Sequence, residues 1–356
     1  MRARKAGLLG LLIACGLLLS GCWDMHDISD RTPIIAMGFD YRTDGTWRAI
    51  ISDALLAQGG SASYSGNIHY GEGPTLTEAI EDLRTHLARR FYLGSTKIYV
   101  LGMGVLQNHS TEVLRMLLQR SEVDQTGFVL CTRGTAQDLL SHPDGAMGLT
   151  GVRLLKEFES EPESRDGHIK EPIWKTVWGA LDTSDTLRIP IFDNLPQTSV
   201  KASGTALITN GQMKTMLDRE ESVTLRWLLN MYGRNVLPLD PPYEGYELKT
   251  SSVRTTTRYD GKTRHISIQS TADMEVYTAP SMKLPAALIQ TLSQAAAETM
   301  VRRIMALTQK MQSADTDGAL WHNTATQAGY FDFDLKKTSV SVTVKVRTAP
   351  HFAPSV

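Results

Sequence analysis

Cys22 is the residue whose chemistry is most clearly marked by its neighbours in this sequence. Three positive charges within the first five residues precede an apolar run from Leu8 to Leu19. The run ends in Leu19-Ser20-Gly21-Cys22, and polar residues follow at once. A basic start, a short apolar stretch and small residues before a cleavage point are typical of a secretory signal peptide. The sequence therefore predicts a lipoprotein signal, in which the Cys22 thiol receives a diacylglyceryl group as a thioether. N-acylation of the new terminus is left open.

The alternative for this segment is an uncleaved membrane anchor. It is disfavoured because the apolar run is well short of the roughly 20 residues that span a bilayer. Cleavage before Cys22 removes three positive charges and changes the formal net charge from −1 to −4. Such a mildly acidic, mixed-charge body lacks the basic surface of nucleic-acid-binding proteins, and its overall charge does not draw it to a membrane. We therefore expect the lipid to hold the protein at the membrane.

Two other motifs could indicate reactive or ligand-binding groups. Cys131 ends the apolar run that begins at Gly127, which favours a small core residue of a buried strand over a reactive thiol. Gly102-Met103-Gly104 follows a predicted strand, but Gln107 stands where a dinucleotide-binding loop needs its third glycine. A plain turn from strand to helix is the favoured interpretation.

Two groups of acidic residues and histidines could in principle hold a metal. His26, with an aspartate on either side of it, follows the predicted anchor and is interpreted as part of a solvated tether. Asp315 and Asp317, near His322, are interpreted as part of a loop. The sequence contains no nucleophile elbow, phosphate-binding loop, paired cysteine ligands or His-Glu-x-x-His helix. We predict no catalytic, cofactor-binding or metal-binding residue, and a protein that is not an enzyme.

The N-terminal half alternates short apolar runs with amphipathic segments, as expected for helices packed on a sheet. Strands are predicted near Ile34–Asp40, Trp47–Leu56, Thr96–Leu101 and Gly127–Thr132. Helices are predicted after Thr75, with Glu78 completing a capping box, and near Ser110–Arg120 and Thr135–Leu140. Two stretches lack an apolar period and are candidate interaction surfaces: a mobile loop over Gly59–Gly73 and a solvent-exposed excursion over Glu157–Asp166.

The C-terminal half contains two hairpin signals and one long helix. Asn210-Gly211 and Asp260-Gly261 each separate two strand-like runs, because these residue types accept the positive φ of a tight turn. Asp218 is predicted to cap a helix, with Glu221 at capping-box spacing. A long amphipathic helix is expected from about Pro285 to Met311. The alternating valines of Val340–Val346 predict a last strand with one buried face.

These elements predict an α/β protein of mixed α+β character, with several domains built from mixed sheets and packed helices. We expect a signal peptide at residues 1–21, an N-terminal domain at 22–196 and a C-terminal domain at 197–356. The last could divide into 197–245 and 246–356, which would give three small domains.

A set of short motifs follows one order along nearly the whole mature chain. The motifs are Cys22-Trp23-Asp24, Ala36-Met37-Gly38-Phe39-Asp40, Gly73–Ile80, Lys97–Val100, Leu117–Glu122 and Gly204–Leu207. A lipidated Cys-Trp-Asp followed by this order resembles the Ger(x)C family, the lipoprotein C subunits of spore germinant receptors.

The resemblance implies a non-enzymatic subunit of three small α/β domains, needed for receptor assembly or signalling during spore germination. It would be tethered through Cys22 to the outer face of the cell membrane, which is the inner membrane of the spore. Its partners would be the receptor A and B subunits and membrane lipid, without nucleic acid, and nutrient binding is attributed to the other subunits. The same anchor and α/β pattern leave an alternative open, a solute-binding lipoprotein of a membrane transporter.

Overall fold

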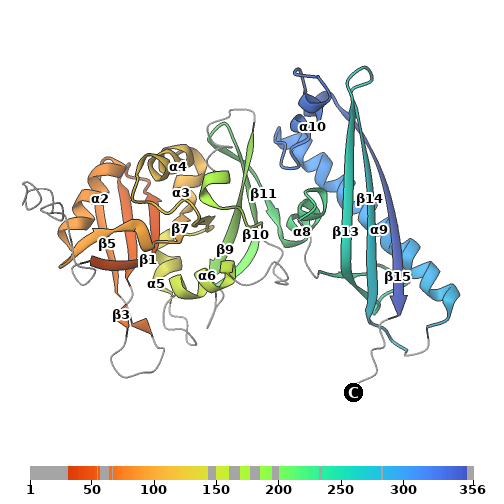
Figure 1. Ribbon diagram of the computed structural model, residues 1–356, viewed down its shortest axis with the longest axis horizontal. Helices are drawn as coiled ribbons and strands as arrows, with labels where there is room; N and C mark the ends of the chain where they lie inside the picture. The colour runs from red at the N-terminus through yellow and green to blue at the C-terminus, as the bar shows by residue number, and fades with distance from the viewer. Residues whose placement is uncertain are drawn as a thin grey trace, which may run out of the picture.

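The computed structural model describes residues 31–350, except 54, 57–63, 66, 143–149, 160–168, 177–184, 195–199, 232–234 and 282–283. The predicted lipidation residue Cys22 and the stretch around His26 lie outside the described residues. The described part is a mixed α/β structure, which confirms the predicted fold class. In Figure 1 a nine-stranded sheet lies to the left and a four-stranded sheet to the right, with helix α8 between them.

The larger sheet runs in the order β11-β10-β9-β8-β7-β1-β2-β5, and β6 also pairs with β1. Its centre is parallel from β1 through β7 and β8 to β9, and antiparallel strands extend it on both sides. The strands are β1 (Arg31–Tyr41), β2 (Trp47–Asp53), β5 (Ile68–Gly73), β6 (Arg90–Tyr92), β7 (Ile98–Leu101), β8 (Phe128–Cys131), β9 (Thr186–Asn194), β10 (Val200–Thr209) and β11 (Gln212–Asp218). A separate small ribbon joins β3 (Leu55–Leu56) to β4 (Tyr64–Ser65).

Helices cover both faces of this sheet, so its central strands are buried on both sides. In β7, Tyr99 and Leu101 pack into one core and Ile98 and Val100 into the other. The first core contains residues of α2 (Leu76–Thr85), α3 (Met103–Asn108) and α4 (Ser110–Gln119). The second contains residues of α5 (Ala136–Ser141) and α6 (Thr150–Glu159). The near-continuous apolar runs of the sequence follow from this double burial.

The C-terminal part packs three helices on one face of the sheet β12-β13-β14-β15. Its elements are α8 (Arg219–Leu228), β12 (Val236–Pro238), β13 (Glu247–Asp260), β14 (His265–Thr278), α9 (Ala286–Ala314), α10 (Trp321–Gln327) and β15 (Ser339–Pro350). Its core also takes in Leu207 and Leu217 from the last strands of the larger sheet. The two sheets therefore share apolar contacts through β10 and β11.

The expected domain boundary at residue 196 falls between β9 and β10. These two strands pair antiparallel along nearly their whole length, from Val200 with Asn194 to Thr209 with Thr186. The larger sheet thus continues across the position at which the sequence changes composition.

Two predictions for the N-terminal half are wrong in part, and residues 59–63 and 66 of the first lie outside the described residues. The predicted loop Gly59–Gly73 ends in strand β5, which pairs with β2. Its glycines suggested a loop, but they are there because α2 lies directly on the strand. A β-carbon at Gly71 would lie 2.6 Å from the carbonyl oxygen of Ala79, and one at Gly73 2.7 Å from the nitrogen of Ala79.

The predicted excursion Glu157–Asp166 begins too early. Residues 157–159 complete helix α6, and Phe158 is buried, with its ring stacked 4.7 Å from that of Phe128. The high local charge made this last turn of α6 look like a loop in the sequence, because a single aromatic residue, Phe158, supplies its apolar contact. Residues 160–168 lie outside the described part of the chain.

Candidate functional site

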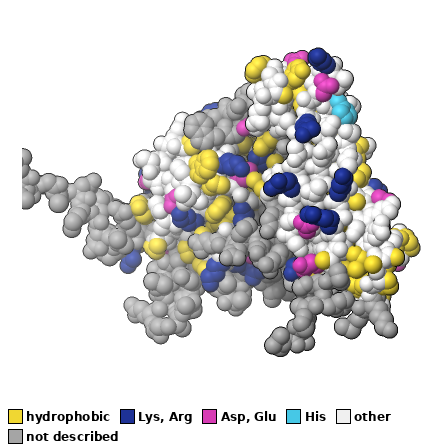
Figure 2. All heavy atoms as spheres, turned by 45° about the vertical axis from the view of Figure 1, so that its right-hand side comes forward, with side chains coloured by type: hydrophobic (Ala, Val, Ile, Leu, Met, Phe, Trp, Pro, Cys, Tyr) yellow, Lys and Arg dark blue, Asp and Glu magenta, His cyan; other side chains and the backbone are white. Residues whose placement is uncertain are grey.

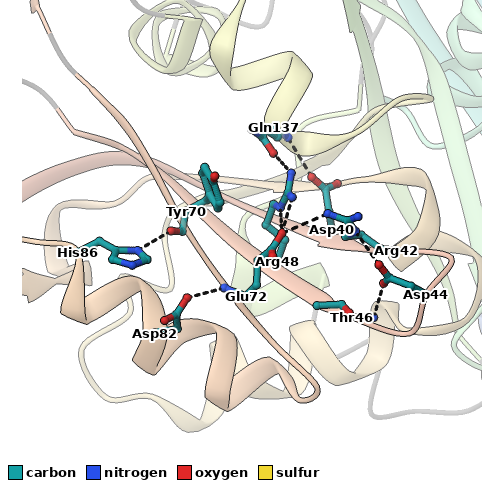
Figure 3. Close-up of polar contacts among 10 residues, drawn as sticks. All are labelled: Asp40, Arg42, Asp44, Thr46, Arg48, Tyr70, Glu72, Asp82, His86 and Gln137. Atoms are coloured by element: carbon teal, nitrogen blue, oxygen red, sulfur yellow. Dashed lines mark hydrogen bonds and ion pairs between the residues drawn. The ribbon is translucent and has the colours of Figure 1, made fainter.

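Asp40 lies at the carboxyl end of β1 and is the centre of a polar cluster (Figure 3). Its carboxylate accepts hydrogen bonds from the backbone N–H groups of Ala136, at 2.7 Å, and Gln137, at 3.1 Å. These are the first two residues of α5, and Thr135 accepts from the third, Asp138, at 3.0 Å. The unpaired N–H groups at the start of α5 are thus satisfied by protein side chains. Burial raises the pKa of Asp40 above its usual value, although the two N–H groups and Arg48 act in the opposite direction.

Two arginines near Asp40, Arg42 and Arg48, are paired with acidic side chains. Arg48 binds the carboxylate of Glu72, its Nε lying 2.8 Å from Oε1, and also the side-chain oxygen of Gln137. Its guanidinium lies over the Tyr70 ring, 4.8 Å from the centroid. Arg42 bridges Asp44 and Glu72, at 3.2 Å each. Figure 3 shows that Arg42 and Arg48 both reach Glu72, and that Arg48 and Asp40 both contact Gln137.

The position of this cluster bears on the glycine-containing turn after β7, for which the sequence favours a plain turn over a dinucleotide-binding loop. In parallel α/β sheets, ligands bind beyond the carboxyl ends of the strands, against helix N-termini. Here Asp40 takes that place at α5, and Gly102 donates its N–H to the carbonyl oxygen of Phe39 at 2.9 Å. Gly102 follows β7 directly and precedes α3, as the interpretation of a plain turn predicted. The arrangement serves to connect sheet and helices.

A second polar cluster joins the larger sheet to the C-terminal helices. His322, at the start of α10, forms ion pairs with Asp185 through Nε2, at 2.8 Å, and with Asp317 through Nδ1, at 2.9 Å. Burial alone would lower the pKa of His322, but the two carboxylates outweigh it and raise the pKa above its usual value. Beside this group the hydroxyls of Thr186, Thr209 and Thr316 lie 2.9–3.3 Å apart.

The sequence had grouped His322 with Asp315 and Asp317 and assigned them to a loop. The structure brings only Asp317 to the histidine, whereas Asp315 pairs with Lys336 at 3.0 Å. Sequence reasoning missed Asp185, because it lies far away along the chain, directly before β9. In the part of the chain that the structure describes, no three histidine, cysteine or acidic residues are arranged to hold a metal ion.

Cys131 is fully buried in β8, as predicted. Its Sγ lies 3.5 Å from the carbonyl oxygen of Pro190, and burial raises the pKa of the thiol far above its usual value. A thiol in this environment is held in its unreactive protonated form.

A cavity of about 420 Å³ lies in the C-terminal part, between α8, β12 and α9. This size falls within the range of small-molecule sites. Charged groups in its wall are already engaged: Arg303 Nε lies 2.6 Å from Glu220 Oε1, and Glu247 accepts from Thr278 at 2.7 Å. The cavity offers a ligand a wall of mixed charge without a nucleophile.

None of the described helices is both long enough and apolar enough to cross a membrane.

Comparison with known proteins gives matches along both halves of the chain. The family model described as spore germination protein N-terminal domain matches residues 24–193. The model described as spore germination B3/GerAC like, C-terminal, matches residues 203–348. Together the two matches cover most of the sequence.

Two curated relatives come from Bacillus subtilis (strain 168). Spore germination protein KC is 24% identical over 264 residues, which is 67% of this chain and 65% of the relative. Spore germination protein B3 is 22% identical over 233 residues, 62% of this chain and 61% of the relative. The chain thus matches somewhat less than two thirds of the length of these proteins. A solved structure titled "Crystal Structure of the GerBC protein" shares the fold, with a TM-score of 0.57 at 14% identity over 88% of this chain and 96% of that one.

Proposed function

The chain belongs to the Ger(x)C family of spore germination proteins, and from that premise we propose that it is a non-enzymatic lipoprotein subunit of a spore germinant receptor. One observation carries the proposal: the two family models match in order along residues 24–193 and 203–348. The subunit serves receptor assembly or signalling, next to an A and a B subunit in the membrane. We also retain two units divided near residue 196, a division supported by the gap between the two matches.

Lipid attachment at Cys22 places this subunit at the outer face of the membrane. The first family match begins at residue 24, two residues after the proposed lipidated cysteine. One acyl chain binds a membrane reversibly, whereas the two of a diacylglyceryl group anchor it stably. Cleavage before Cys22 would make this residue the mature N-terminus, two residues before the family match begins.

A binding or structural role is supported by the state of the polar groups. Asp40 and its charged neighbours are engaged with each other and with α5, and Cys131 is buried and protonated. Catalysis needs a nucleophile or base that can reach a substrate. The clusters that the structure describes instead fasten helices to sheets.

Replacement of Cys22 by Ala in a sporulating host tests the proposal. We expect the variant protein to leave the membrane fraction and the spores to lose most of their response to the nutrients of that receptor. Cys131→Ala removes the other thiol of the mature chain and serves as the control, which should retain both properties. Normal membrane retention and a normal nutrient response of Cys22→Ala spores would contradict the proposal.

Co-purification separates this function from the alternative of a transporter lipoprotein. A receptor subunit should co-purify from spore membranes with an A and a B subunit, encoded by neighbouring genes. Co-purification with a transporter permease, encoded next to this gene, would instead support a solute-binding lipoprotein.

A further inference from the structure

One face of the four-stranded sheet is open to solvent. Helix α9 and the shared apolar core cover the other face, where Ile266, Ile268 and Val344 are buried. Figure 1 shows β13, β14 and β15 side by side, and Figure 2 shows the outer surface of this part of the molecule, where Lys and Arg side chains stand among uncharged polar ones.

Three cations lie on the half of this face nearer the β13–β14 turn. Arg254 and Arg258 come from β13 and Lys345 from β15, and all three are exposed. The strand register places Thr271 between Arg254 and Lys345. Because strands lie about 4.8 Å apart, these two cations stand about 10 Å from each other, and Arg258 follows Arg254 on the same face about 13 Å along the strand. The side chains between them are uncharged: Thr256, Ser267, Gln269, Thr271, Ser341 and Thr343. The next positions on the same face carry Asp273, which is paired with Arg347, at one end and Asp260 at the other.

These cations differ from most others of the described surface, because no described carboxylate lies within ion-pair distance of them. Arg347, one register step further along β15, is paired with Asp273 at 2.7 Å. On α9, Arg303 is paired with Glu220 and Lys310 with Glu221, both at 2.6 Å. The three unpaired charges therefore make a local positive surface on a protein whose net charge, without residues 1–21, is −4.

We propose that this face, defined by Arg254, Arg258 and Lys345, rests on an anionic lipid surface. The three cross-strand rows from Arg254 to Arg258 place no apolar side chain on this face. Stable protein interfaces, by contrast, have an apolar, aromatic-rich core. Attraction to anionic headgroups needs only cations near the surface. Charge alone thus favours a lipid occupant over a protein.

The proposal rests on the proposed lipid tether. Three cations bind a membrane weakly from solution, but a tether at the N-terminus raises their effective concentration at the surface. Their combined attraction corresponds to a roughly hundredfold preference for the face-down orientation, which is about 3 kcal/mol at 1.4 kcal/mol per factor of ten. The lipid at Cys22 would hold the protein at the membrane, and the cationic sheet face would set its orientation there.

Orientation on vesicles tests the proposal without natural lipidation. Residues 22–356 with Cys22→Ser are attached through an N-terminal histidine tag to a nickel-chelating lipid. Cys131 is buried, so a fluorophore can be placed on a single introduced thiol, either Gln269→Cys on the face or Gln294→Cys on the exposed side of α9. Energy transfer to a headgroup-labelled lipid reports which side lies near the membrane.

We expect stronger transfer from position 269 than from position 294 on vesicles with phosphatidylglycerol, and equal transfer on pure phosphatidylcholine. The difference should disappear at about 1 M salt, where the Debye length falls to about 3 Å. It should also disappear in the triple variant Arg254→Gln, Arg258→Gln, Lys345→Gln. The matched control removes three exposed cations elsewhere, by Arg115→Gln, Lys156→Gln and Lys201→Gln, and should keep it.

Equal transfer from both positions on anionic vesicles would overturn the proposal, as would a triple variant that orients like the parent. A triple variant that orients normally but no longer co-purifies with the A and B subunits would assign the face to a protein partner instead. Because the tether is artificial, failure of Cys22 lipidation in spores leaves this result unaffected. The two proposals can therefore fail separately.

Discussion

Gly102 and Asp40 lie so close together that a β-carbon on residue 102 would overlap the Oδ1 atom of Asp40. The same β-carbon would lie 3.2 Å from the nitrogen of Ala136, to which Asp40 is hydrogen-bonded. The glycine at the end of β7 therefore makes room for a carboxylate that comes from β1 and binds the start of α5. Three segments of the N-terminal half meet at this point.

Substitution of Gly102 tests this contact. Gly102→Ala should lower the free energy of unfolding by about 1–3 kcal/mol, because the added carbon displaces a buried, hydrogen-bonded carboxylate. Gly134→Ala is the matched control, since a β-carbon there meets no atom within 4 Å. Urea denaturation of both variants measures the difference, and equal stabilities would show that the contact is not tight.

Removal of the carboxylate itself should have a related effect. Asp40→Ala leaves the N–H groups of Ala136 and Gln137 without their acceptor, and we expect a loss of about 2–4 kcal/mol. Asp44→Ala removes an exposed aspartate from the turn that follows β1, and its effect should be much smaller. Thermal unfolding followed by circular dichroism gives the comparison. A variant at Asp40 that is as stable as the one at Asp44 would contradict the capping role.

The His322 cluster predicts a pH dependence of stability. Because the folded-state pKa of His322 is raised, its contribution is complete below the unfolded value near 6.5 and is lost as the pH rises through the folded pKa. The free energy of unfolding, measured in urea at a series of pH values above about 6, should therefore fall over this range.

Two variants assign this pH dependence to the cluster. His322→Gln should abolish the part of the fall that comes from this residue. Asp185→Asn keeps one of the two carboxylates and should give an intermediate slope. An unchanged slope in His322→Gln would exclude the histidine as its origin.

The buried thiol gives a prediction about reactivity. In residues 22–356 with Cys22→Ser, Cys131 should react with a thiol reagent only as fast as the protein unfolds, because the group is fully buried and protonated. Thr343→Cys adds an exposed thiol on β15, which should react at once. Rapid labelling of Cys131 in the folded protein would contradict its place in the core.

Local features of the fold were predictable because the groups that form them are neighbours in sequence. Asn210 and Gly211 have φ values of 54° and 73°, as a tight hairpin turn between β10 and β11 requires. Asp218 and Glu221 form both hydrogen bonds of the predicted capping box, each 2.8 Å long. Strand β5 was missed because its glycines are required by the close packing of helix α2 on the strand. They do not mark a turn of their own backbone.

The polar clusters lay beyond such reasoning. His322 is bound by Asp185, and Asp40 by the first turn of α5, and each pair is brought together by the order of strands in the larger sheet. Sequence spacing carries no information about partners of this kind. The unpaired state of Arg254, Arg258 and Lys345 also depends on register, since a shift by one residue would turn these side chains toward the core.

By itself the sequence determined the mixed α/β class, most strands and helices, and the resemblance to one family, and it is the source of the proposed lipid attachment at Cys22. These follow from residue order, apolar periodicity and short-range hydrogen bonding, which act within a few residues. Only the tertiary structure decided that Asp40 binds the first turn of α5 at the carboxyl edge of the sheet, and that one sheet face carries unpaired cations. Both depend on which strands become neighbours, and that is set by the packing of the whole chain.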